Sequence, residues 1–115
     1  MITEDYVSVE IAKLLKEKGF NCRVTRSYFE NDDCYAPCDP SEVQRKDVIR
    51  IPTLQMAMKW LREIHNITIS ISFDENNRIC HVVRKDGNQI YSIDTPKSYE
   101  EVCKEDIKYC LKNLI

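Results

Sequence analysis

The chain of 115 residues has the usual size of one domain, and we expect a single domain over residues 1–115. Hydrophobic residues make up 43% and charged residues 31%, and the formal net charge is -2, so the composition disfavours both disorder and a general polyanion binder. The most apolar run, "ITISISF", is far shorter than the ~20 residues of a membrane span, and the acidic start "MITEDY" does not resemble a secretory signal. We therefore expect a cytoplasmic protein that does not associate with membranes.

The first predicted element is a helix over 7–18, because apolar residues recur at helical spacing in "VSVEIAKLLKEK". Thr3 or Ser8 can serve as its N-cap, and Gly19 suits a left-handed C-cap. In the next segment, "FNCRVTRSYF", apolar and polar residues alternate, which predicts a strand over about 20–28.

Residues 30–51 would form an unusually long loop, so we expect further structure within them. The motif "DPSE" places Asp39 at an N-cap and Pro40 at the first helical position, which predicts a short helix over 40–47. The run "VIRI" then extends into Pro52, because proline disfavours helix in the residue before it.

A second long helix is predicted over 53–66, in "TLQMAMKWLREIHN", with Thr53 as N-cap and Asn66 at its end. Its polar residues form one narrow stripe, so its apolar arc is wider than a single buried face requires. The residues spaced to face the sheet are Leu54, Ala57, Met58, Leu61 and Ile64.

Met56 and Trp60 lie one turn apart on an adjoining flank of this helix, which we expect to be a covered interaction surface. Either the first helix or a second copy of the chain in a homodimer can cover it, and we favour the first helix. In both cases Trp60 should be largely buried.

Three strands follow, in "ITISISF", "RICHVVR" and "QIYSID", and the turn "KDGN" with Gly87 joins the last two as a hairpin. A final helix opens at Ser98 with the capping box "SYEE". The order is α-β-(short α)-α-β-β-β-α. It predicts an α+β domain with an antiparallel three- to four-stranded meander, the early strand on one edge, and helices packed on one face.

Two blocks of the sequence, "YVSVEIAKLLKEKGFN" and "IPTLQMAMKWLREIHNITISI", resemble a widespread group of small bacterial proteins of mobile and prophage-like DNA. The similarity covers Tyr6 to about Asn21 and Pro52 to Ile71, and resumes with "YEE" at Tyr99. The final helix departs from the group's pattern, which is richer in Ala and Leu. The resemblance implies a bacterial cytoplasmic setting and assigns no activity, cofactor or catalytic residue.

The only cysteines predicted outside regular elements are Cys34 and Cys38, in "NDDCYAPCDP". They are weak metal candidates, because a zinc site needs four ligands and no second cysteine pair lies in a loop. We interpret them as two reduced thiols, more reactive than the other four cysteines. His65 at a helix end is interpreted as a capping or core-edge residue, and His81 as a residue on the polar face of a strand. We expect no cofactor, no catalytic residue and no enzymatic activity.

The function that we favour is a non-catalytic protein-interaction or accessory module with an unidentified protein partner. The alternative is a nucleic-acid-associated or HicB-like antitoxin-type regulator. From Thr53 onward the order α-β-β-β-α is that of a double-stranded-RNA-binding domain, but the last helix begins "SYEE", where phosphate binding needs basic residues. The likeness to a HicB-type partner domain is an analogy of fold order alone.

Overall fold

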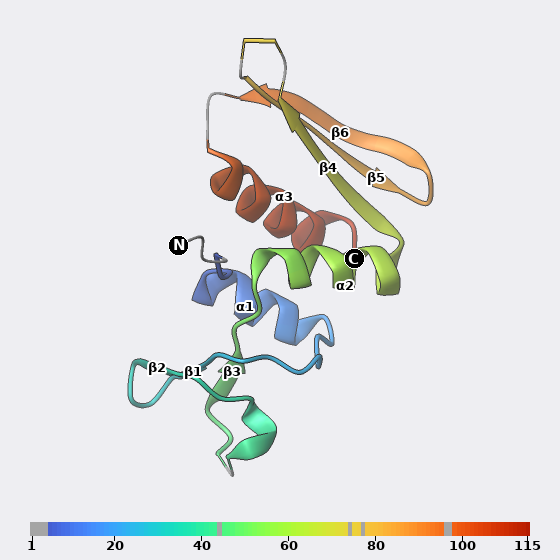
Figure 1. Cartoon of the computed structure of the whole chain (residues 1–115). Coiled ribbons are helices and arrows are strands. Elements are labelled where there is room, and N and C mark those ends of the chain that lie inside the picture. Colours follow the sequence, from blue (N-terminus) through green and yellow to red (C-terminus); the bar gives the residue numbers. More distant parts are fainter. Residues whose placement is uncertain (1–4, 44, 74, 77, 96–97) are drawn as a thin grey trace. The chain divides into compact units, whose positions relative to one another are not determined.

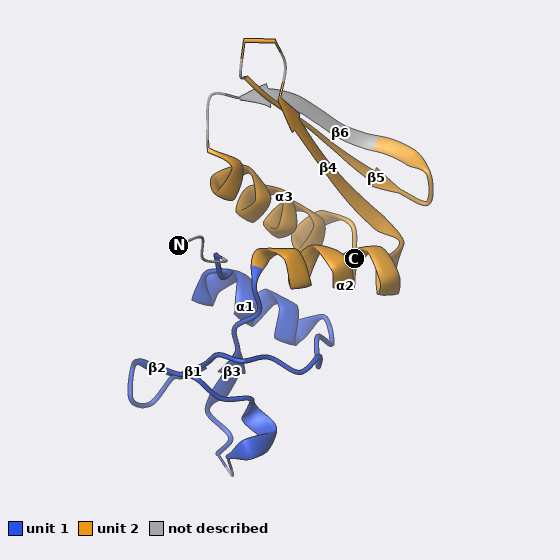
Figure 2. Cartoon of the chain, viewed as in Figure 1, with its two compact units in different colours: residues 1–53 blue, residues 54–115 orange. Residues whose placement is uncertain are grey.

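The computed structural model describes residues 5–43, 45–73, 75–76, 78–95 and 98–115, and for residues 90–95 the backbone alone. Three α-helices, one 3-10 turn and two antiparallel three-stranded sheets follow one another along these residues, so the predicted α+β class is confirmed (Figure 1). The chain divides into two compact units, residues 1–53 and residues 54–115 (Figure 2).

Unit 1 is a helix followed by a small sheet. Its elements are α1 (Val9–Glu17), β1 (Ser27–Phe29), β2 (Cys34–Ala36), the 3-10 turn η1 (Pro40–Glu42) and β3 (Val48–Arg50). The sheet has the order β2-β1-β3 with antiparallel neighbours, and α1 packs against β3. Of the strand predicted over about 20–28, only the end forms a strand, in β1, and the prediction for residues 20–26 is wrong. The strand also belongs to a separate sheet and not to the edge of the later meander.

The signals at both ends of α1 act as the sequence predicts, whereas the helix predicted after Asp39 forms only in part. The hydroxyl of Ser8 caps α1 by accepting a hydrogen bond from the amide of Ile11 at 3.2 Å, and Gly19 after the helix has a φ of 93°. The alternative cap, Thr3, lies outside the described residues. Asp39 caps η1, but the turn ends at Glu42, so the helix predicted over 40–47 is wrong beyond its first turn.

The carboxylate of Asp39 is the buried polar centre of unit 1. It accepts hydrogen bonds from the amide of Val24 at 2.8 Å, and from the amide and hydroxyl of Ser41 at 2.9 and 2.6 Å. Arg50 lies 3.8 Å from the same carboxylate. These contacts tie the segment before β1 to η1 and β3, so one acidic side chain holds together three parts of the unit that are far apart in sequence.

Unit 2 is a three-stranded meander with two helices. Its elements are α2 (Leu54–His65), β4 (Ile67–Phe73), β5 (Ile79–Lys85), β6 (Asn88–Thr95) and α3 (Tyr99–Asn113). The sheet order is β4-β5-β6, and both helices lie on the same side of the sheet, with α2 against β4 and α3 against β4 and β5 (Figure 1). The positive φ values of Asn66, Asp86 and Gly87 make the predicted reversals, and the Ser98 hydroxyl caps α3.

The buried face of α2 contains Leu54, Ala57, Trp60 and Leu61. Met58 is half-buried, and Ile64 is 63% exposed, so the prediction that Ile64 faces the sheet is wrong. Position 64 has the correct helical phase, but it lies in the last turn before the chain reverses at Asn66. Helical periodicity gives the phase of a side chain, whereas its burial also depends on how far along the helix the covering layer extends.

Candidate protein-interaction groove

One histidine and one carboxylate are buried together in the centre of unit 2. His81 lies in β5 opposite Ile71 of β4, on the same sheet face as Ile79 and Val83. Its Nδ1 atom is 2.7 Å from Oδ2 of Asp106 in α3, and both side chains are 1% exposed. The interpretation of His81 as a polar-face residue is therefore wrong, because strand parity places it under α3, where its Nδ1 atom meets Asp106.

This His81–Asp106 pair does not have the properties of an active site. Burial raises the pKa of the Asp106 carboxyl, and the neighbouring His81 opposes that rise. One helical turn further on, burial and the nearby Asp106 raise the pKa of the Cys110 thiol to about 12, far above the range of a thiolate nucleophile. Neither side chain of the pair can meet a substrate unless the helix–sheet interface opens. We therefore infer that the pair contributes to the stability of the fold.

The weak metal candidates Cys34 and Cys38 lie at the start of β2 and just after it. Cys34 is exposed and Cys38 is half-buried, and both are free thiols. The prediction that Cys34 lies outside regular structure is wrong, since it pairs with Phe29 across the hairpin. Among the described residues, no group of three or more His, Cys, Asp or Glu side chains is placed to hold a metal ion.

The predicted interaction flank of α2 is largely inaccessible. Trp60 is 5% exposed, as expected, and its ring meets the ring of His65 edge-on, with the centroids 4.7 Å apart and the planes at 71°. Met56 is half-buried. A partner would therefore meet Met56 before Trp60, and the proposed cover of this flank stays a prediction.

The accessible apolar surface of unit 2 lies along β4. Four side chains of this strand point to the helix side of the sheet, and their exposure rises along the strand: Ile67 is buried, Ile69 and Ile71 are half-buried, and Phe73 is 59% exposed. Their partners on β5, Val83, His81 and Ile79, are all buried. The two helices thus cover β5 and the start of β4, and leave the second half of β4 open.

A groove of about 390 Å³ lies over this open part. We call it the β4 groove. Ile69, Ile71 and Met58 contribute its apolar side chains, and Gln55, Lys59, Arg62 and Tyr99 its polar ones. Gln55 donates a hydrogen bond from Nε2 to the hydroxyl of Tyr99 at 3.0 Å, which links the first turn of α2 to the first turn of α3.

The charge of the groove is positive. Lys59 and Arg62 are both exposed, and no carboxylate of the described residues forms an ion pair with either of them. Lys59 and Arg62 belong to the polar stripe of the helix predicted over 53–66. The sequence did not indicate that an uncovered strand lies beside them. Their spacing carries no such signal, because the exposure of β4 depends on where the helices cross the sheet.

Strand β4 is also an edge of its sheet. Within the described residues it pairs with β5 alone, so the backbone groups on its other side are not part of a ladder. Such an edge is a ready template for another extended chain. The groove and the edge thus belong to the same strand.

None of the described helices has both the length and the apolar character needed to cross a membrane. No known protein family, no curated protein and no solved structure matches the chain.

Proposed function

We propose that the protein is a non-catalytic interaction module that binds an extended, acidic and apolar segment of a partner protein along β4. The observation that carries the proposal is the rise in exposure from Ile67 to Phe73 on an edge strand, beside two cations that form no ion pair among the described residues. An added strand gains affinity from main-chain hydrogen bonds and specificity from its alternate side chains.

The chemistry of the β4 groove favours a particular segment. Alternate residues of an added strand would point towards the helix side, where Ile69, Ile71 and Phe73 offer apolar contacts. Carboxylates near them would meet Lys59 and Arg62. A sequence alternating branched apolar residues with Asp or Glu satisfies both conditions.

A heterologous partner is favoured over a homodimer at this edge. In a two-fold contact between two β4 edges, each copy would bring its own Lys59 and Arg62 to the same interface. Like charges would then meet without a compensating carboxylate, whereas an acidic partner would neutralise them.

Nucleic acid is disfavoured as the partner, although unit 2 has the α-β-β-β-α order of a double-stranded-RNA-binding domain. The first turn of α3, where such domains place cations on phosphates, carries the exposed acids Glu100 and Glu101. Unit 2 has nine basic and nine acidic residues, so it lacks the net positive charge that nucleic acid attracts. We further propose a bacterial cytoplasmic setting, which rests on the sequence resemblance.

The test uses matched charge reversals. We expect a synthetic peptide that alternates Ile or Val with Asp or Glu to bind the full chain in fluorescence anisotropy, and its scrambled form to bind weakly. Arg62→Glu should weaken peptide binding at least about tenfold, whereas Lys112→Glu, an exposed cation on α3, should leave it unchanged.

The same variants serve as baits in affinity purification from the native host. Partners recovered with the wild type and with Lys112→Glu, but not with Arg62→Glu, support the proposal. Peptide binding that is insensitive to Arg62→Glu contradicts it. Binding of duplex RNA or DNA that Arg62→Glu abolishes, and that falls steeply with salt, would replace the proposal with the nucleic-acid alternative.

A further inference from the structure

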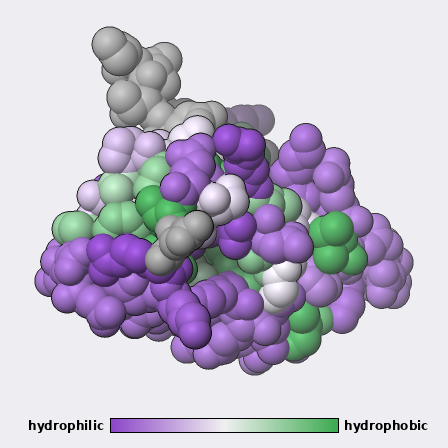
Figure 3. Space-filling model, turned by 90° about the horizontal axis from the view of Figure 1, so that it is seen from below, coloured by the Kyte–Doolittle hydropathy of each residue, from purple (hydrophilic) through white to green (hydrophobic). Residues whose placement is uncertain are grey.

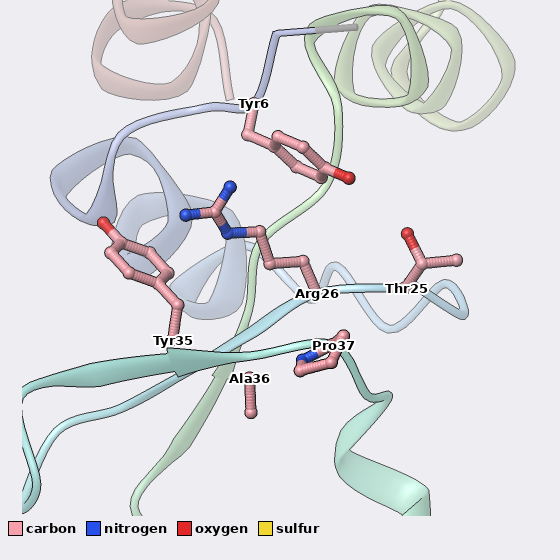
Figure 4. Close-up of a pocket in the computed structure, with 6 residues that line it drawn as sticks. All are labelled: Tyr6, Thr25, Arg26, Tyr35, Ala36 and Pro37. Carbon is pink, nitrogen blue, oxygen red and sulfur yellow. The ribbon is translucent and has the colours of Figure 1, made fainter. Parts of the chain in front are cut away.

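Unit 1 carries a second feature, in which an arginine is held between two tyrosine rings. The guanidinium carbon of Arg26 lies 4.8 Å from the ring centroid of Tyr6 and 4.2 Å from that of Tyr35. Figure 4 shows the side chain of Arg26 reaching between the two rings, which come from the segment before α1 and from β2. We call these three side chains the Arg26 clamp.

Both tyrosines are themselves held in place. The ring of Tyr35 packs against Tyr28, its cross-strand neighbour, with centroids 5.2 Å apart, and the Tyr28 hydroxyl donates a hydrogen bond to Asp33. The backbone of Tyr6 forms a β-bridge with that of Thr53. These contacts restrain the Tyr35 ring and the Tyr6 backbone before any ligand arrives, which lowers the entropy that binding would cost.

The clamp lines a cavity of about 320 Å³, and its other lining residues are Thr25, Ala36 and Pro37. This volume lies at the lower end of the ~300–1,000 Å³ that is typical of small-molecule sites. The cavity belongs entirely to unit 1, and the hydroxyls of Tyr6, Thr25 and Tyr35 are the neutral hydrogen-bonding groups among its lining side chains (Figure 4).

Arg26 differs from the other arginines of unit 1 in its partners. Arg45 pairs with Asp32 and Asp47 at 2.6 Å. Arg23 pairs with Glu42 at 3.1 Å, and Arg50 lies 3.8 Å from Asp39. The side chain of Arg26 meets the two tyrosine rings, and among the described residues its N–H groups have no hydrogen-bond acceptor.

The two contacts hold the cation against both rings, while its N–H groups keep their capacity to donate hydrogen bonds to a ligand. The edge of a guanidinium carries a fork of N–H donors that matches the oxygens of a carboxylate or a phosphate. Contact with aromatic rings removes water from the cation, which strengthens its attraction for such an anion.

We propose that the Arg26 clamp is a binding site for an oxyanion, a carboxylate or phosphate group carried by a small molecule, with the guanidinium N–H groups as its principal donors. This site is independent of the β4 groove, which lies in unit 2.

The experiment is a titration of the full, ¹⁵N-labelled chain with sodium phosphate and, separately, with sodium acetate, each against sodium chloride at equal ionic strength. We expect a saturable shift of the Arg26 Nε–H signal with at least one of the two anions, and none with chloride. A shift with phosphate alone identifies a phosphoryl ligand, and a shift with acetate alone identifies a carboxylate. A shift with both shows that the site accepts either oxyanion.

Arg26→Lys keeps the positive charge and loses the planar fork, so it should weaken the response of the neighbouring amide signals at least about tenfold. The matched control is Arg23→Lys, an exposed arginine in the same segment, which should leave the response unchanged. The proposal is overturned if neither anion produces a saturable shift in the wild type, or if Arg26→Lys responds as the wild type does. The wild-type titration decides the question even if a variant fails to fold.

Discussion

The buried pair of His81 and Asp106 allows a quantitative prediction about stability. The two side chains are each 1% exposed and are joined by a 2.7 Å hydrogen bond. Removing one partner of a buried pair leaves the other unsatisfied and costs about 3–5 kcal/mol, whereas replacing both by apolar residues is often nearly neutral. We therefore expect Asp106→Leu and His81→Leu each to destabilise strongly, and the double variant to be more stable than either single variant.

The expected loss is large beside the total stability of a small domain, which is about 5–15 kcal/mol. It corresponds to a fall in melting temperature of about 10–25 °C. Urea unfolding, followed by far-ultraviolet circular dichroism and by the fluorescence of Trp60, measures it. Glu63→Leu removes an exposed charge from α2 and should change stability by no more than about 0.5 kcal/mol.

The pair also predicts a pH dependence with a definite sign. Because burial raises the pKa of Asp106 in the folded state, its ionisation opposes folding. The stability that the protonated carboxyl contributes is complete below the unfolded pKa and is lost as the pH rises through the folded pKa. The difference in stability between the wild type and Asp106→Asn should therefore fall over that interval.

A cost of less than about 1 kcal/mol for Asp106→Leu would show that water reaches the pair, and would refute the reasoning from burial.

Three further predictions concern other positions. A hydrogen bond from the Ser41 hydroxyl lowers the pKa of Asp39 to about 2. The stability that the Asp39 carboxylate contributes should therefore be present above the unfolded pKa of about 3.9 and be lost as the pH falls towards 2. Asp39→Ala should cost about 1–3 kcal/mol and remove this pH dependence in acid titrations of unfolding. Trp60→Ala should cost about 3–5 kcal/mol, and the wild-type Trp60 fluorescence should be blue-shifted and resist quenchers; free quenching in a folded monomer would contradict its burial. A thiol reagent should label the exposed Cys34 first and the buried Cys110 only after unfolding, and mass spectrometry of timed digests would show whether that order is reversed.

Signals that act over a few residues were predictable because their physics is local. Ser8 and Ser98 cap their helices, and Asn66 and Gly87 reverse the chain with positive φ. In each case one side chain or one backbone conformation satisfies groups within four residues of it. The alternation of "ITISISF" likewise predicted a strand with one apolar face.

The tertiary structure decided which surfaces those elements cover. Sequence parity gives β4 one apolar face, but only the positions of α2 and α3 leave Ile71 and Phe73 open while covering Ile67. The same placement buries His81 against Asp106. Asp106 lies within the apolar stripe of α3, and this was the one sequence signal of a buried polar contact. Strand pairing and helix crossing join residues far apart in sequence, so no local pattern specifies them. For that reason the fold class followed from the sequence, whereas the β4 groove and the Arg26 clamp emerged only from the folded chain.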